Sequence, residues 1–194
     1  VIFGSDTSFG SDARVGASFA WGNTSAQSNA GVAPQSQTSN MYQFIGYGSY
    51  ALTEKLEANF MANGGWNSNN SNRQIGFMGT SAQASYNSAV WHVGAGLSQP
   101  FDVGMNTQLI PSVRYDYNSV YNQGYSETGA NYGLGLNVNS QSYQMSIVGA
   151  NAKVVHHLSD HNSVNANLGV NYNFNPTQTY VAAAFQGSPG LVFT

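Results

Sequence analysis

The stretch Ser163-Val-Asn-Ala-Asn-Leu-Gly-Val-Asn-Tyr-Asn-Phe174 decides the fold, because its two side-chain faces differ without exception. Its odd positions hold only Ser, Asn and Gly, whereas its even positions hold Val164, Ala166, Leu168, Val170, Tyr172 and Phe174. Alternation with a period of two is typical of a β-strand that has one apolar face and one polar face. The stretch is also long enough to cross a bilayer as a tilted strand, which takes about 9 to 11 residues.

Further segments alternate in the same way, and we interpret each of them as a strand. Arg14–Gly22, Lys55–Asn67 and Ser88–Ser98 put mainly apolar and mainly polar residues on opposite faces, and within Lys55–Asn67 only Met61 falls on the polar side. Met41–Leu52 is aromatic on both faces, which leaves its orientation open. Rougher or partial strands bring the predicted count to nine, and these are Val1–Phe9, Gln108–Asn118, Val148–Val154 and Thr179–Gly187.

The connections between the predicted strands alternate in length. The short turns are Gly10–Asp12, Leu52–Lys55, Pro100–Asn106 and Leu158–Asn162. The longer polar loops are Asn23–Asn40, Asn67–Thr80, Asn118–Asn131 and Asn175–Gln178. In bacterial outer-membrane barrels the short turns face the periplasm and the longer loops face outside, so this alternation favours an up-and-down barrel.

Composition narrows the class of protein further. Only 7% of the 194 residues are charged, against about 25% in soluble globular proteins, so an ordinary soluble surface is hard to build. No run approaches the roughly 18 apolar residues of a membrane helix, which excludes a helical membrane protein. Five basic residues and a net charge of -3 provide no basic stripe for a phosphate backbone, and we expect no nucleic-acid partner.

Two other architectures fit parts of this pattern. A soluble β-sandwich would need a strongly charged outer face, and the polar faces of these strands carry few charges. An Asn- and Gln-rich cross-β fibre would show internal repeats at a fixed spacing, and no such repeat is found. The sequence therefore favours an all-β fold, namely an antiparallel up-and-down transmembrane β-barrel.

In such a barrel the polar strand faces line the lumen and the apolar faces contact lipid. Neutral amides on the lumen wall can hydrate a passing or resting polypeptide without holding it. Opposite charges, such as Lys55 with Glu57 and Arg114 with Asp116, would pair on the inner wall. The predicted lumen-lining residues are Arg14, Lys55, Glu57, Asn59, Asn63, Arg114, Asp116, Asn151, Lys153, Asn165, Asn167 and Asn171.

The histidines are the first candidates for chemistry, but their spacing does not favour an active site. His156, His157 and His161 lie close together in the sequence, on either side of a predicted turn. Adjacent residues on a strand point to opposite faces, so we interpret the cluster as part of a periplasmic turn and not as a metal site. We interpret His92 as a hydrogen-bonded residue of the lumen wall. We therefore expect no enzyme, no metal and no cofactor.

Short motifs occur in a fixed order along the chain. Val1–Gly16 contains a G-x-D strand, a tight turn and an R-x-G strand. Glu127–Ala130 reads E-x-G-A, and Leu136–Gln141 reads L-x-V-x-S-Q. The close, Ala184–Thr194, contains F-x-G-x-P-G-x-x-F. Together these motifs resemble the C-terminal translocator domain of bacterial autotransporters, the type V secretion barrel.

The resemblance implies a barrel of about twelve strands with a helix in the lumen, of which residues 1–194 would form a single, partial domain with about nine strands. No helix precedes Val1, and the chain stops at Thr194 and not at a terminal aromatic residue. We therefore expect the sequence to be truncated at both ends.

The function implied by the resemblance is that of an outer-membrane translocator, which anchors an N-terminal passenger domain and helps to export it. The implied location is the bacterial outer membrane, as an integral protein. The implied partners are outer-membrane lipid, the protein's own passenger polypeptide and the outer-membrane assembly machinery. The alternative is a free-standing outer-membrane pore or small β-barrel protein.

The face assignment can be tested with arginine substitutions on one strand. Replacing Ala166 or Leu168 with Arg is expected to cost about 2 to 4 kcal/mol near the bilayer midplane, because the guanidinium would lie in lipid. The same change at Asn167 is expected to be mild, since that side chain faces the lumen. A denaturant titration of the protein folded in phospholipid vesicles measures both losses, and equal losses on the two faces would contradict the assignment.

Overall fold

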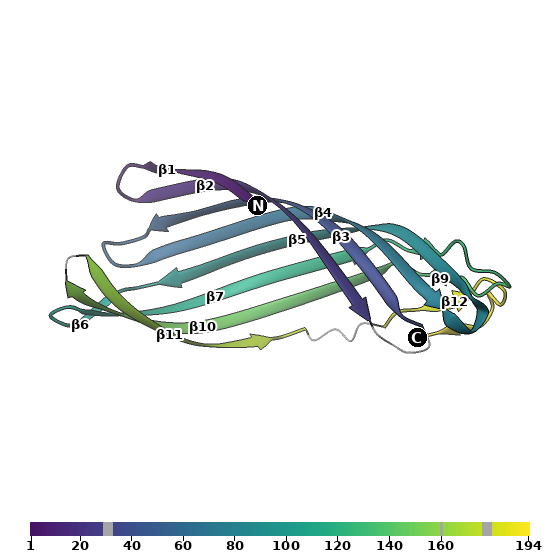
Figure 1. Cartoon of the computed structure of the whole chain (residues 1–194). Coiled ribbons are helices and arrows are strands. Elements are labelled where there is room, and N and C mark those ends of the chain that lie inside the picture. The colour runs from purple at the N-terminus through teal and green to yellow at the C-terminus, as the bar shows by residue number, and fades with distance from the viewer. Residues whose placement is uncertain (29–32, 160, 176–179) are drawn as a thin grey trace.

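The computed structural model describes residues 1–28, 33–159, 161–175 and 180–194. Within them, a curled antiparallel sheet of nine strands forms a long wall, and a sheet of four short strands lies at one end (Figure 1). The wall consists of β1 (Ile2–Phe9), β2 (Ala13–Ser28), β3 (Gln35–Ala51), β4 (Glu57–Ile75), β5 (Thr80–Ser98), β6 (Phe101–Gly104), β7 (Thr107–Asn122), β10 (Gln141–Ser159) and β11 (Asn162–Asn173). The small sheet consists of β8 (Tyr125–Ser126), β9 (Leu136–Val138), β12 (Ala183–Phe185) and β13 (Val192–Phe193).

The wall is an up-and-down meander. Its strand order is β1-β2-β3-β4-β5-β7-β10-β11, and β6 pairs with β7 alone. The chain leaves the wall after β7 to form β8 and β9 and then returns as β10. In the small sheet, the order is β13-β12-β9-β8. The predicted fold class is confirmed, because nearly all regular structure in the described residues is antiparallel β.

The prediction of a last wall strand at Thr179–Gly187 is wrong. Of its described part only Ala183–Phe185 is a strand, and it pairs with β9 and β13 in the small sheet. Ala183 and Ala184 are both buried although they point to opposite faces. A strand buried on both faces shows no alternation between apolar and polar residues, so this segment lacks the pattern of a wall strand.

Two of the predicted loops are also wrong, because strands continue through them. β2 and β3 run through most of Asn23–Asn40, and β4 runs through most of Asn67–Thr80, at the end of which β5 begins. Both faces of these strand ends carry polar residues, so the alternation disappears although the backbone ladder continues. The predicted loop Asn118–Asn131 likewise contains the end of β7 and the whole of β8. The predicted loop Asn175–Gln178 lies mostly outside the described residues.

The connection between β4 and β5 shows how tight one predicted loop is. It consists of a single 3-10 turn, η1 (Gly76–Met78), followed by Gly79 in the left-handed conformation with φ of 61°. Glycine adopts this conformation without steric cost, which lets the chain reverse direction at once.

No helix in the described part of the chain is long and apolar enough to span a membrane.

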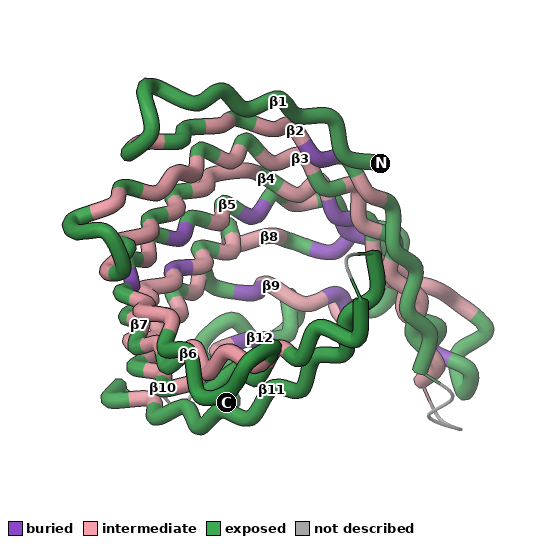
Figure 2. The backbone as a smooth tube through the Cα atoms, turned by 90° about the vertical axis from the view of Figure 1, so that its left-hand side faces the viewer, coloured by how far each residue is buried: buried purple, intermediate pink, exposed green. Residues whose placement is uncertain are grey.

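In the middle of the wall, polar side chains are more buried than their apolar neighbours. On β5, His92 is 9% exposed, whereas its neighbours Trp91 and Val93 are 45% and 43% exposed. The register extends this pattern, since Asn63, His92 and Asn118 lie opposite one another on β4, β5 and β7. Figure 2 shows that the sheet curls around the side on which β8, β9 and β12 lie, so the polar face is the concave one.

An aromatic row crosses the outer, convex face of the wall. Trp21, Tyr42 and Trp66 lie opposite one another on β2, β3 and β4, and the rings of Tyr42 and Trp66 stack at 5.5 Å. Trp91 and Tyr117 form a further pair, with ring centroids 4.9 Å apart. Beyond this row β2, β3 and β4 are largely polar on both faces, whereas β5 has Ala82, Ala84 and Tyr86 on its concave face. Amphipathic rings prefer the membrane-water interface, so the row is placed as expected for one edge of an apolar band.

Two adjacent glycines on β4 provide a matched test of this packing. A Cβ atom at Gly65 would overlap the carbonyl oxygen of Tyr42 and lie 2.9 Å from Gln43 Cα, whereas at Gly64 nothing lies within 4 Å. Gly65→Ala is expected to cost about 1–3 kcal/mol, because the ladder between β3 and β4 must move. Gly64→Ala is expected to be neutral or to stabilise by about 0.4–1 kcal/mol through the unfolded chain.

The measurement for both glycine variants is a guanidinium titration in detergent micelles, with the folded fraction read from gel mobility without heating. Equal losses in the two variants, or a larger loss in Gly64→Ala, would contradict the packing described for Gly65.

Candidate functional site

The concave face of the wall is the candidate functional site, and the predicted lumen-lining residues gather on it. The strand register places all of them on this face except Lys55. Lys55 lies in the turn before β4, where its Nζ is 3.5 Å from Asp102 Oδ2. The predicted pair of Lys55 with Glu57 is therefore wrong, because the turn directs the lysine towards the neighbouring hairpin of β6 and β7.

A polar network crosses the middle of the concave face. His92 Nε2 lies 2.7 Å from Asp116 Oδ1, and His92 Nδ1 lies 3.1 Å from Asn63 Nδ2. Asn63 Oδ1 in turn accepts a hydrogen bond of 2.7 Å from Gln43 Nε2. Because the Asn63 amide nitrogen can only donate, His92 Nδ1 is the acceptor, and the Nε2 proton is donated to Asp116. The network thus fixes the orientation of the His92 ring.

Arg114 extends the network across three strands. Its Nε donates to both carboxylate oxygens of Asp116, at 2.8 and 2.9 Å, and its Nη1 donates to Asn59 Oδ1 at 2.9 Å. Its buried Nη2 has no hydrogen-bond partner among the described residues. A Cβ at Gly94 would overlap Asp116 and Arg114, and one at Gly96 would lie 3.1 Å from Asn59 Oδ1. The two glycines therefore let these side chains lie flat against β5. The predicted pair of Arg114 with Asp116 is present.

A second ion pair lies on the concave face of β1 and β2. Arg14 Nη2 donates to Asp6 at 2.9 and 2.8 Å, and the hydroxyl of Tyr47 donates to Asp6 Oδ2 at 3.3 Å. The ring of Tyr47 occupies the space that a side chain at Gly16 would need. This contact also settles the orientation of β3, which the sequence left open: its odd-numbered residues face the concave side.

The small sheet is fixed to the concave face by a buried ion pair. Arg73 on β4 donates to both carboxylate oxygens of Glu127, and the two side chains are 14% and 6% exposed. Arg73 also donates to the carbonyl of Leu134 at 3.1 Å, and the Leu136 amide donates to Glu127 Oε2 at 2.9 Å. Gln186 Nε2 donates to the Glu127 carbonyl at 2.7 Å. Glu127 therefore joins the wall to three parts of the chain.

Aromatic contacts support this attachment. The rings of Tyr86 on β5 and Tyr125 on β8 stack with centroids 4.5 Å apart, and Gln37 on β3 donates to the Tyr86 hydroxyl at 3.1 Å. Burial raises the pKa of the Tyr125 phenol, and the nearby Tyr86 and Glu127 raise this pKa further. The phenol therefore stays neutral at physiological pH. The segment around β8 thus packs on the concave face at the end of the wall opposite the short turns.

The sequence offered only weak signals for this attachment. Arg73 and Glu127 are the charged residues of two predicted loops, and their opposite signs are the one feature that could have suggested a contact. Their separation of 54 residues is not visible in any local pattern. Tyr86 and Gln37 were likewise missed as contact residues.

The histidine cluster does not form a site. His156 Nδ1 lies 2.8 Å from the Thr107 hydroxyl on β7. His157 is the next residue on β10 and therefore points to the other face, and His161 lies beyond the end of the strand. The three side chains are thus separated by the strand and its turn.

An antiparallel meander with a polar concave face, an apolar outer band and an aromatic row is the architecture of transmembrane β-barrels. The family model of the autotransporter beta-domain matches residues 1–194. The chain therefore belongs to the autotransporter β-domain family, and it is an outer-membrane translocator domain for a passenger. Domains of this family are transport barrels.

A solved structure has the same fold. The translocator domain of the autotransporter NalP from Neisseria meningitidis superimposes with a TM-score of 0.79 at 17% sequence identity. The match covers 94% of this chain and 67% of the NalP chain. Among curated protein sequences no relative matches.

The role of Glu127 can be tested by hydrogen exchange. Glu127→Gln is expected to leave the Arg73 guanidinium buried without a counter-charge, which is strongly unfavourable. The amides of β8 and β9 should therefore exchange at least about tenfold faster, corresponding to about 1.4 kcal/mol or more of local stability. Amides of the wall should be unaffected. Glu57→Gln, at an exposed position of the same concave face, is the control and should change neither region; unchanged exchange in Glu127→Gln would contradict the assignment.

Proposed function

We propose that the concave face is the wall along which the passenger polypeptide passes, with the predicted lumen-lining strand residues as its contact surface. The observation that carries this proposal is the reversed burial of the wall, which turns amides inward and aliphatic side chains outward. Asn and Gln side chains both donate and accept hydrogen bonds, so they can exchange with the backbone of a moving chain. We also propose that residues 1–194 act as one domain.

The charged residues of the concave face are mostly paired with one another, which favours passage of the passenger over tight binding of it. Asp6 is paired with Arg14, and Asp116 is shared between Arg114 and His92. An ionised side chain that is already paired offers little net attraction to a passing residue of opposite charge. The wall therefore combines hydrogen-bonding capacity with few free charges, which suits a passenger of any sequence.

The proposed location is the bacterial outer membrane, with the short turns towards the periplasm and the aromatic row near the outer surface. Lipid would cover the apolar convex band. The outer-membrane assembly machinery is a proposed partner, because β1 and β11 are the edges of the wall among the described residues. Unpaired edges are costly in lipid and need protection until they are paired.

We propose no covalent chemistry for this chain. Among the described residues His92 and Asp116 pair in the way that a base and its orienting carboxylate do, but both ring nitrogens of His92 are already engaged, by Asp116 and by Asn63. No nitrogen is left to activate a nucleophile, and a triad requires a hydroxyl or thiol within hydrogen-bond reach of the base.

The proposed path can be tested by cross-linking, because the chain contains no cysteine. Ser18 faces the concave side of β2 and Ala17 the convex side. A passenger with a single cysteine, stalled during export, is expected to form a disulfide with Ser18→Cys and not with Ala17→Cys. The two variants are adjacent and equally conservative, so their difference reports only the face of the wall.

Export of an unstalled passenger, measured by its protease sensitivity on intact cells, is the control and should be unchanged in both variants. Equal cross-linking at the two positions, or cross-linking at Ala17→Cys alone, would contradict passage along the concave face.

A further inference from the structure

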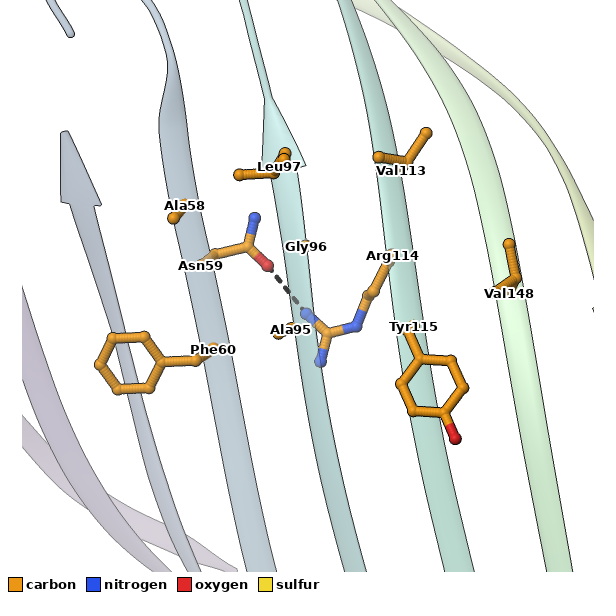
Figure 3. A pocket seen from close by; sticks show the side chains of 10 residues that line it. All are labelled: Ala58, Asn59, Phe60, Ala95, Gly96, Leu97, Val113, Arg114, Tyr115 and Val148. Atoms are coloured by element: carbon orange, nitrogen blue, oxygen red, sulfur yellow. Dashed lines mark hydrogen bonds between the residues drawn. The ribbon is translucent and has the colours of Figure 1, made fainter. Parts of the chain in front are cut away.

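The outer face of the wall carries a preformed apolar groove. It crosses β4, β5, β7 and β10 and has a volume of about 470 Å³. Figure 3 shows Phe60 on one side and Tyr115 on the other, with the small side chain of Ala95 between them. Its lining side chains on the convex face are Ala58, Phe60, Ala95, Leu97, Val113, Tyr115 and Val148.

The groove follows from the register of the strands. Phe60, Ala95 and Tyr115 lie opposite one another, so a large, a small and a large residue follow in one row. In the neighbouring row Ala58 lies opposite Leu97, which in turn lies opposite Val113. The floor of the groove is thus formed by alanine, and its walls are formed by aromatic and branched side chains.

Hydrogen bonds hold side chains in place on both faces of the sheet at the groove. On the convex face, the Tyr115 hydroxyl donates to Ser146 Oγ at 3.4 Å, which orients that ring as a wall. On the opposite face of β5, the bond from Arg114 to Asn59 lies across Gly96, directly behind the groove. A rigid site pays little entropy to order itself when it binds a ligand.

The position of the groove indicates its occupant. Phe60 lies near the start of β4, just after a short turn, whereas the aromatic row at Trp66 lies further along the strand. The groove therefore occupies the half of the apolar band nearest the short turns, which is the half on the periplasmic side in the proposed orientation. That side of the outer membrane is a phospholipid leaflet.

We propose that this groove binds one acyl chain of a phospholipid from the periplasmic leaflet. The inference rests on the proposed function, because it requires the convex band to lie in the membrane. The walls offer carbon atoms almost exclusively, and the volume is comparable with that of a single fatty acyl chain. A chain in the groove touches protein on three sides, so it gains more dispersion contacts than one against a flat strand surface.

The test uses the full chain in phosphatidylcholine vesicles that contain a spin-labelled phosphatidylcholine. Electron paramagnetic resonance measures how many lipids per protein are motionally restricted. Ala95→Phe fills the groove and is expected to remove one restricted lipid per protein. Ala166→Phe adds the same ring on the convex face of β11, away from the groove, and is expected to leave the number unchanged.

A second variant keeps the test decisive if Ala95→Phe does not fold. Phe60→Ala removes one wall of the groove and is also expected to release the restricted lipid. An unchanged number of restricted lipids in a folded variant would overturn the proposal. A wild-type chain that proves dimeric in the vesicles, with variants that are monomeric, would also overturn it, since a second copy of the chain would then be the occupant.

Folding is read from heat-modifiable gel mobility in the same samples. A wild-type chain that gives no compact, heat-modifiable form in these samples would overturn the proposed function itself. A folded chain without the restricted lipid would overturn only the groove.

Discussion

The backbone ladder is the constraint on which the rest of this structure depends. In lipid no water is present to satisfy an amide or a carbonyl, so each strand must find a partner along its whole membrane-crossing length. The meander from β1 to β11 meets this demand by pairing consecutive strands. Once the ladder is fixed, the period of two assigns each side chain to lipid or to the interior, and the exposed Trp91 and buried His92 follow directly from it.

The same strand serves different purposes on its two faces. On β5, Gly94 and Gly96 allow Arg114, Asp116 and Asn59 to lie against the concave side. Between them, Ala95 forms the floor of the apolar groove on the convex side. A residue one position away thus belongs to another solvent environment, which is why a register shift by one residue would exchange the two surfaces completely.

Alternation in the sequence was sufficient to predict the wall where one face is apolar, and it put residues such as Asn63 and Arg114 together on the face that is concave in the structure. It failed where that contrast is absent. The ends of β2, β3 and β4 beyond the aromatic row are largely polar on both faces, and Ala183 and Ala184 are both buried although they point to opposite faces, so neither segment shows a period of two. The contact of Arg73 with Glu127 was missed because it joins residues that are distant in the sequence. Lys55 was misplaced because a turn, and not the strand pattern, directs it.

The most direct test of the reversed burial is a scan of single cysteines along β5 from Ala89 to Ser98, in a chain without native cysteines. Each is spin-labelled, and its collisions with oxygen, which partitions into lipid, are compared with those of a water-soluble nickel complex. The odd positions are expected to favour oxygen and the even positions the nickel complex, with a period of two throughout. A uniform profile, or one in which the even positions face lipid, would contradict the account.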